Sequence, residues 1–104
     1  MPATPLTPGE LDQVLTDLPG WSVRDGSLAA DFKADRASVP GLYLAVAAAE
    51  DEANHHAAIH ILYGTIGFAL NTHDAGDAIT ALDTALAARI SALAAEHGAE
   101  PAGG

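Results

Sequence analysis

The sequence contains no cysteine, which excludes disulfides, thiolate chemistry and cysteine-ligated metals. The chain has only four basic residues and 14 acidic ones, and the formal net charge is −10. Such a surface repels phosphate backbones and anionic lipid headgroups, so we expect no nucleic-acid or membrane partner. No apolar run approaches the roughly 18 residues of a membrane span. The first ten residues, MPATPLTPGE, lack the basic and apolar regions of a signal peptide, so a soluble, cytoplasmic protein is expected.

The length of 104 residues predicts a single domain over 1–104, with a core over about 7–97 and a disordered tail over 98–104. Alanine makes up roughly a quarter of the chain, and a compact, helix-rich domain is expected. Because alanine packs helices closely but fills little volume, we expect the domain to gain stability by burying a face against a second copy.

The N-terminal third predicts a helix followed by a hairpin. Thr7-Pro8-Gly9-Glu10 has the pattern of a capped helix start, and Pro19-Gly20 should stop that helix. The stretch 21–24 alternates apolar and polar residues, Asp25-Gly26 is a hairpin-turn signal, and 27–33 reads as the partner strand. Trp21 is expected in the core.

The rest of the chain predicts a helix, two more strands and a final helix. The second helix should run from about Pro40 to Ala53, and 59–72 reads as strand with a bend at Gly64 and with Tyr63 packed in the sheet. Thr80-x-x-Asp83 resembles a capping box before a helix that ends near residue 97. The predicted fold is therefore α+β, in the order α-β-β-α-β-β-α, with three helices on one face of a four-stranded, mostly antiparallel sheet.

Three histidines are the candidate catalytic residues. His55 and His56 lie where a helix gives way to a strand, and His73 closes the strand that follows. If that strand returns beside the junction, the three side chains lie at one end of the sheet. Imidazole titrates near neutral pH, which suits general acid–base chemistry. His60 is instead expected to face solvent on a strand, and His97 to interact with the dipole at a helix end.

A zinc site is the alternative use of the same side chains, with His55, His56, His73 and the nearby Asp51 as ligands. The chain contains no HExxH or similar spacing. The sequence therefore favours acid–base chemistry without a metal.

The spacing Asp51-x-x-x-His55-His56, then Tyr63, Thr72-His73 and Asp83, resembles the signature of the pterin-4a-carbinolamine dehydratases. The resemblance extends over roughly residues 11–93 and includes Leu-Pro-Gly-Trp at 18–21 and Ala-Glu at 49–50. Two positions depart from the family, which usually has proline where this chain has Ala57 and a large aromatic residue where it has Ile59. The loop between His73 and Thr80 also looks about one residue longer than usual. A missing proline would leave the backbone at the pocket rim less restrained.

The resemblance implies a dehydratase that removes water from 4a-hydroxytetrahydrobiopterin without a cofactor. It implies His55, His56 and His73 as the catalytic residues, with acid and base not assigned among them. It implies Asp51, Thr72 and Asp83 as substrate-binding residues. The expected partners are a reduced pterin and further copies of the chain, as a homodimer or homotetramer. A non-catalytic binding or assembly module is the alternative, because relatives in animals also act as dimerisation partners of a transcription factor.

Overall fold

This computed structural model describes residues 4–102. Its fold is built on one antiparallel sheet. Its four main strands lie in the order β1-β2-β4-β3, and a short fifth strand also pairs with β2. The strands are β1 (Ser22–Arg24), β2 (Ser27–Lys33), β3 (Ala58–Leu62), β4 (Thr65–Leu70) and β5 (Glu100–Pro101). The helices are α1 (Pro8–Leu15), α2 (Val39–Ala53) and α3 (Ala81–Glu96), with single 3₁₀ turns η1 (Arg36–Ser38) and η2 (His73–Ala75).

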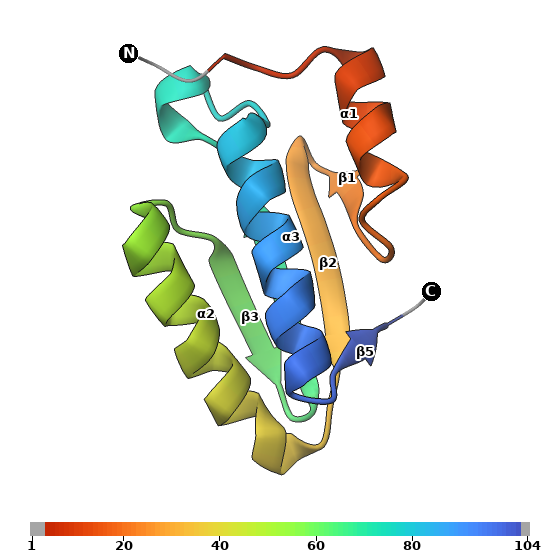
Figure 1. The fold of residues 1–104 in the computed structure, drawn as a ribbon, viewed down its shortest axis with the longest axis vertical. Helices are drawn as coiled ribbons and strands as arrows, with labels where there is room; N and C mark the ends of the chain where they lie inside the picture. The colour runs from red at the N-terminus through yellow and green to blue at the C-terminus, as the bar shows by residue number, and fades with distance from the viewer. Residues whose placement is uncertain (1–3, 103–104) are drawn as a thin grey trace.

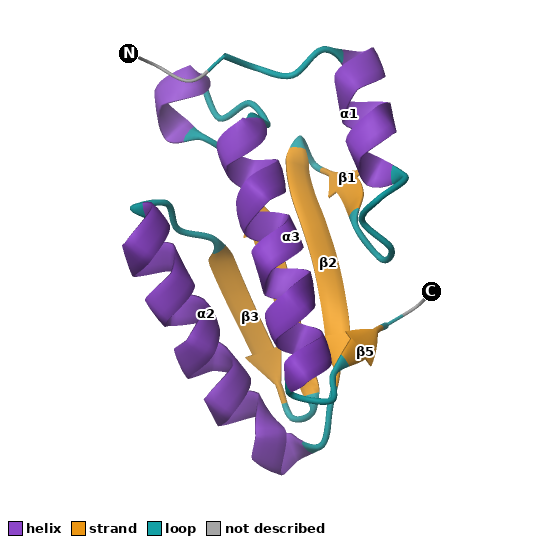
Figure 2. Cartoon of the chain, in the orientation of Figure 1, coloured by secondary structure: helices purple, strands orange, loops and turns teal. Residues whose placement is uncertain are grey.

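Helices α2 and α3 lie side by side across one face of the sheet, and α1 lies beside β1 (Figure 1). Alternation along β2 and β4 turns Phe32, Ile66 and their neighbours toward these helices, where they are buried. The Trp21 and Phe68 rings contact the Phe32 ring edge-on, with ring centroids 6.2 and 6.0 Å from it. The predicted α+β class, the three helices and the core position of Trp21 are confirmed (Figure 2).

Three local expectations were wrong. Helix α1 ends at Leu15, well before the Pro19-Gly20 pair, although Leu18 still reaches the core. Tyr63 does not pack in the sheet: it lies in the β3–β4 turn with a positive φ of 52°, and the residue is 77% exposed. The tail does not fray over its described part, because β5 pairs with β2 and the Ala102 N–H donates to the Asp31 carbonyl. Residues 103–104 of the predicted tail and 1–3 of the N-terminal segment lie outside the described residues.

Three chain segments meet at one end of the molecule (Figure 1). These are the end of α2, the stretch after β4 and the start of α3. Asn54 ends α2 in the left-handed conformation, with φ 52°. A backbone bridge between Thr72 and Ala78 closes the loop that carries η2 and leads the chain into α3. Over residues 4–102, every helix is too short or too polar to cross a bilayer.

Candidate active site

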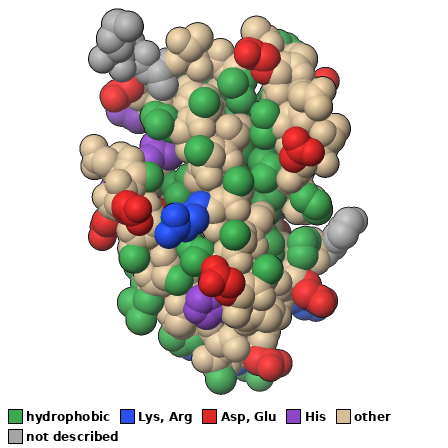
Figure 3. Space-filling view, in the orientation of Figure 1, with side chains coloured by type: hydrophobic (Ala, Val, Ile, Leu, Met, Phe, Trp, Pro, Cys, Tyr) green, Lys and Arg blue, Asp and Glu red, His purple; other side chains and the backbone are tan. Residues whose placement is uncertain are grey.

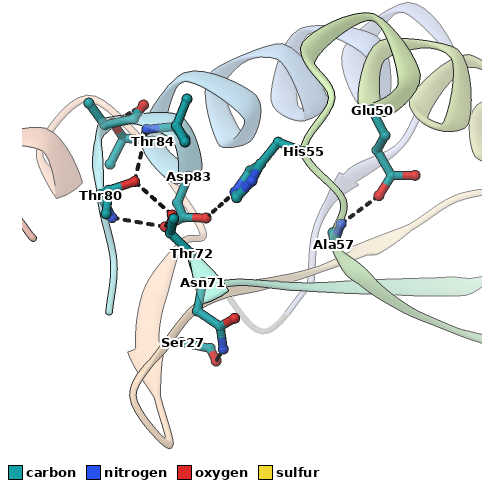
Figure 4. A network of polar contacts seen from close by, with 11 residues as sticks. Ser27, Glu50, His55, Ala57, Asn71, Thr72, Thr80, Asp83 and Thr84 are labelled. Carbon is teal, nitrogen blue, oxygen red and sulfur yellow. Dashed lines mark hydrogen bonds and ion pairs between the residues drawn. The ribbon is translucent and has the colours of Figure 1, made fainter. Parts of the chain in front are cut away.

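The carboxylate of Asp83 is the centre of a buried polar network in the first turn of α3 (Figure 4). The side chain has no exposed surface. Its Oδ2 accepts hydrogen bonds from the Thr80 backbone N–H and the Thr72 hydroxyl, both at 2.8 Å. Its Oδ1 lies 2.5 Å from Nε2 of His55, which follows α2. Three segments of the chain are therefore fixed to one carboxylate.

Local hydrogen bonds explain why these groups stay in place. The Thr80 hydroxyl caps α3 by accepting from the Leu82 N–H at 3.2 Å, and a carboxylate at Asp83 suits the positive end of the helix dipole. The Thr72 and Thr80 hydroxyls lie 2.7 Å apart, and the Thr72 N–H donates to the Ala78 carbonyl at 2.9 Å. No buried side-chain polar atom in the described chain lacks a partner. The network is thus satisfied before any ligand arrives.

The contact with Asp83 fixes the His55 ring in one orientation. An ionised carboxylate only accepts hydrogen bonds, so Nε2 of His55 carries the proton that it donates. Nδ1 of the neutral ring then remains as an acceptor, and it forms no hydrogen bond with residues 4–102. The side chain of His55 is 12% exposed and lines a groove of about 290 Å³ between α2 and α3, together with Leu82 and Arg89. The arrangement can accept a proton on Nδ1 while Asp83 holds the opposite ring nitrogen.

The other two predicted catalytic histidines pair with different carboxylates at the surface. Nε2 of His56 lies 3.1 Å from Asp51, and Nδ1 of His73 lies 3.2 Å from Asp77. Both rings are open to solvent, and the His73 side chain is 93% exposed. Figure 3 shows histidine side chains gathered beside the segment that joins β4 to α3.

Of the six residues predicted from the sequence, the structure brings three together through hydrogen bonds: His55, Thr72 and Asp83. Asp51 and His56 form a separate pair, and His73 is the chain neighbour of Thr72. Within the described chain, no hydrogen bond joins one of the three imidazoles directly to another. That all three rings serve one ligand stays a prediction.

The remaining histidines lie away from this network. His60 is exposed on β3, as expected, and lines a larger hollow of about 590 Å³ on the face of the sheet that carries no helix. The Nδ1–H of His97 donates to the Leu93 carbonyl at 2.9 Å at the end of α3, which agrees with the predicted interaction there. Across residues 4–102, no three histidine, aspartate or glutamate side chains are grouped as metal ligands.

Two residues of this region were not among the site residues predicted from the sequence, although both belong to patterns noted there. The hydroxyl of Thr80 forms a hydrogen bond with the Thr72 hydroxyl, whereas the capping pattern predicted only its role at the start of α3. The carboxylate of Glu50 is buried and accepts the backbone N–H of Ala57 at 2.5 Å (Figure 4). An acidic residue on the inward face of a helix is the signal that could have pointed to Glu50.

Comparison with known proteins identifies what the chain is similar to. The family described as "Pterin 4 alpha carbinolamine dehydratase" matches residues 4–93. Proteins named "Putative pterin-4-alpha-carbinolamine dehydratase" from Streptomyces coelicolor and Streptomyces avermitilis are 39% and 34% identical, and each alignment covers 95% of this chain and 99% of the relative. The crystal structure of a transcriptional coactivator/pterin dehydratase from Brucella melitensis superposes with a TM-score of 0.81 at 27% identity, covering 86% of this chain and 98% of that one.

Proposed function

Because the chain belongs to the pterin-4-alpha-carbinolamine dehydratase family, we propose that it removes water from 4a-hydroxytetrahydrobiopterin to give quinonoid dihydrobiopterin. The observation that carries this proposal is the buried Asp83 carboxylate bonded to His55 at the edge of a groove. A buried carboxylate that orients a partly exposed imidazole is an arrangement that supports proton transfer.

The reaction needs two proton transfers and no net change in oxidation state. The C4a–O bond breaks and the departing hydroxide takes a proton to become water. The N5–H proton is lost, and a double bond forms between N5 and C4a. Imidazoles perform both transfers without a metal or an organic cofactor.

In this proposal, His55 takes the N5 proton on Nδ1. The Asp83 carboxylate holds the opposite nitrogen, Nε2, in place. Asp83 itself has no surface to offer to a pterin, so it acts as a positioning residue. Thr72 supports the same carboxylate and is itself buried, so its contact with the substrate stays a prediction.

Either His56 or His73 supplies the one proton that the departing hydroxide takes in this mechanism. Both rings are exposed and each lies beside a carboxylate, Asp51 for His56 and Asp77 for His73. Asp51 is also accessible to a polar edge of the pterin.

Single-residue variants test the acid–base mechanism. His55→Ala and His73→Ala should each lower the dehydration rate by about 100-fold or more, since general acid–base catalysis contributes that much. Stopped-flow absorbance of freshly prepared carbinolamine measures the rate, and circular dichroism checks the fold. His60→Ala, an exposed histidine on β3, is the matched control and should keep the wild-type rate. Unchanged rates in both test variants would remove the mechanism.

A non-catalytic binding module is the second candidate. The structural neighbour from Brucella melitensis is described as a transcriptional coactivator as well as a pterin dehydratase. Calorimetry with a reduced pterin, carried out beside the turnover assay, separates the two functions. A well-folded protein with neither pterin affinity nor turnover would favour the module.

We also propose that the chain forms a homodimer or homotetramer. Strand β3 is an edge of the sheet, and the consecutive residues Ile61, Leu62 and Tyr63 are exposed along it and its turn. An unpaired apolar edge invites pairing with another strand. On the helix side, Tyr43 and Leu44 are exposed on α2.

Light scattering coupled to size-exclusion chromatography measures the oligomeric state. Leu62→Lys should dissociate an assembly built through the strand edge, whereas Leu44→Lys should dissociate one built through α2. A wild-type protein that is monomeric at high concentration would refute self-association.

A further inference from the structure

Glu50 holds the backbone on both sides of the His55–His56 pair. At the end of α2, its backbone carbonyl accepts the His55 N–H at 3.1 Å, while the Asn54 N–H donates to the Asp51 carbonyl at 3.2 Å. These two bonds, with Asn54 in the left-handed conformation, form a Schellman helix end. The side chain of Glu50 then reaches past the histidines and accepts the Ala57 N–H at 2.5 Å. Glu50 therefore holds the backbone at both ends of the His55–His56 pair.

The burial of Glu50 needs an explanation beyond stability. Glu50 is 5% exposed, and Glu50 and Asp83 are the two acidic residues buried within 4–102. Burying a carboxylate is costly unless it is well hydrogen-bonded, whereas an apolar side chain at this position would add to the core. The Ala57 N–H is its hydrogen-bond donor in the described chain, in a charge-assisted bond. Figure 4 shows Glu50 and Asp83 on opposite sides of the segment that carries His55.

This contact depends on the residue type at position 57. Proline has no backbone N–H, so it could not donate to Glu50. The family that this chain resembles usually has proline after the histidine pair, and proline restrains that backbone through its ring. Here the Glu50–Ala57 hydrogen bond restrains the same stretch by other means.

We propose that Glu50 is a positioning residue that fixes the direction of the His55 and His56 side chains through the backbone of residues 55–57. Its catalytic consequence rests on the proposed dehydratase function, whereas its effect on the geometry of the pair does not. Without the carboxylate, the segment after Asn54 keeps the bond from the His55 N–H to the Glu50 carbonyl but loses the bond from the Ala57 N–H. The His55 ring then leaves Asp83 for part of the time, and its fixed tautomer is lost.

The first test measures geometry without substrate. Glu50→Ala should speed hydrogen exchange at the Ala57 amide by about tenfold or more, since exchange reports local opening. Nitrogen NMR of the imidazoles should show that His55 loses its single tautomer. Glu50→Gln keeps a carbonyl oxygen that can accept the same N–H, and it should retain both wild-type signatures. Glu96→Ala, at an exposed acidic residue at the end of α3, is the matched control.

The second test restores the restraint by a different route. The double variant Glu50→Ala/Ala57→Pro replaces the hydrogen bond with a proline ring and should recover the His55 signature that Glu50→Ala loses. In turnover, Glu50→Ala should lower kcat by about tenfold, with a smaller change in KM, because misplacement of a reacting group acts mainly on the chemical step. The double variant should regain most of kcat.

Three results would overturn the proposal. Wild-type Ala57 exchange and His55 spectra in Glu50→Ala would show that the hydrogen bond positions nothing. If Glu50→Ala does not fold, a Glu50→Gln protein that folds but has lost the His55 signature would contradict it, and one that keeps the signature would support it. A double variant as impaired as Glu50→Ala would also count against it. Because exchange and imidazole spectra need no pterin, they decide the matter even in a protein without dehydratase activity.

Discussion

Two helices of this protein begin with the same local device, but only one of the two takes part in the site. At the start of α1, the Thr7 N–H donates to the Glu10 side chain at 2.9 Å, and both residues are exposed. At the start of α3, the Thr80 N–H donates to the Asp83 side chain at 2.8 Å, and both residues are buried. Each is a capping box formed by a threonine and an acidic residue three positions later.

The difference lies in what the second carboxylate oxygen contacts. Both hydrogen bonds of Glu10 return to Thr7, so the α1 box is purely local. Asp83 uses Oδ1 for His55 and shares Oδ2 between Thr80 and Thr72. The capping carboxylate of α3 therefore also organises the site, because it is buried from water and accepts hydrogen bonds from other segments of the chain. The comparison predicts a graded series of effects.

The largest effect on stability should come from Asp83→Ala. It leaves His55, Thr72 and the Thr80 N–H without their shared acceptor in the interior, which should lower the free energy of unfolding by about 3 kcal/mol. Urea denaturation followed by circular dichroism measures this. Glu10→Ala is the matched variant, and its loss should be clearly smaller because water replaces the exposed bonds. Equal losses would mean that burial does not distinguish the two boxes.

Asp83→Asn should separate stability from proton transfer. The amide keeps the volume of the carboxylate but loses its charge, and its NH₂ group offers donors where His55 and Thr80 also donate. We expect the dehydration rate to fall by about 100-fold, with a change in the His55 tautomer visible by NMR. Glu10→Gln, the same chemical change in the exposed box, should leave the rate unaltered. A wild-type rate for Asp83→Asn would exclude the charged pair from the mechanism.

Thr72→Val probes the third partner of Asp83 with little change in volume. It removes one hydrogen bond to the carboxylate and leaves the Thr80 hydroxyl with one contact fewer, which should cost about 1.5 kcal/mol of unfolding free energy. Thermal or urea denaturation gives the value, and Thr84→Val is the control, since its hydroxyl forms an exposed bond to the Ala81 carbonyl. An effect no greater than that of Thr84→Val would place Thr72 outside the cooperative network.

Much of this comparison could be predicted from the sequence, because both capping boxes are local patterns. Threonine with an acidic residue three positions later announced both helix starts, and the Asp25-Gly26 hairpin followed from turn chemistry. The connection of Asp83 to His55 spans 28 residues and has no local signal. The resemblance to a family grouped these residues, but it did not indicate that Asp83 would be buried and hold the imidazole.

The errors have equally local causes. Strand β5 is two residues long and contains Pro101, so no alternating pattern announced it, and its pairing with Phe32 and Lys33 depends on where α3 ends. Tyr63 is an aromatic residue of a type that favours strands, but it occupies a turn position with positive φ beside Gly64. In both cases, tertiary placement outweighed residue preference.

The smallest effect should be the pH dependence of the exposed box. The hydrogen bond from the Thr7 backbone, with a second contribution from the Thr7 side chain, lowers the pKa of Glu10 from its ordinary value of 4.5. A group with a lowered folded-state pKa stabilises the fold above its unfolded-state value, and this contribution disappears as the pH falls through the folded-state value. The difference in unfolding free energy between the wild type and Glu10→Gln should therefore be constant at neutral pH and shrink in acid. Denaturation at a series of pH values measures it. A difference that is the same in acid and at neutral pH would mean that the charge of Glu10 contributes nothing to its cap.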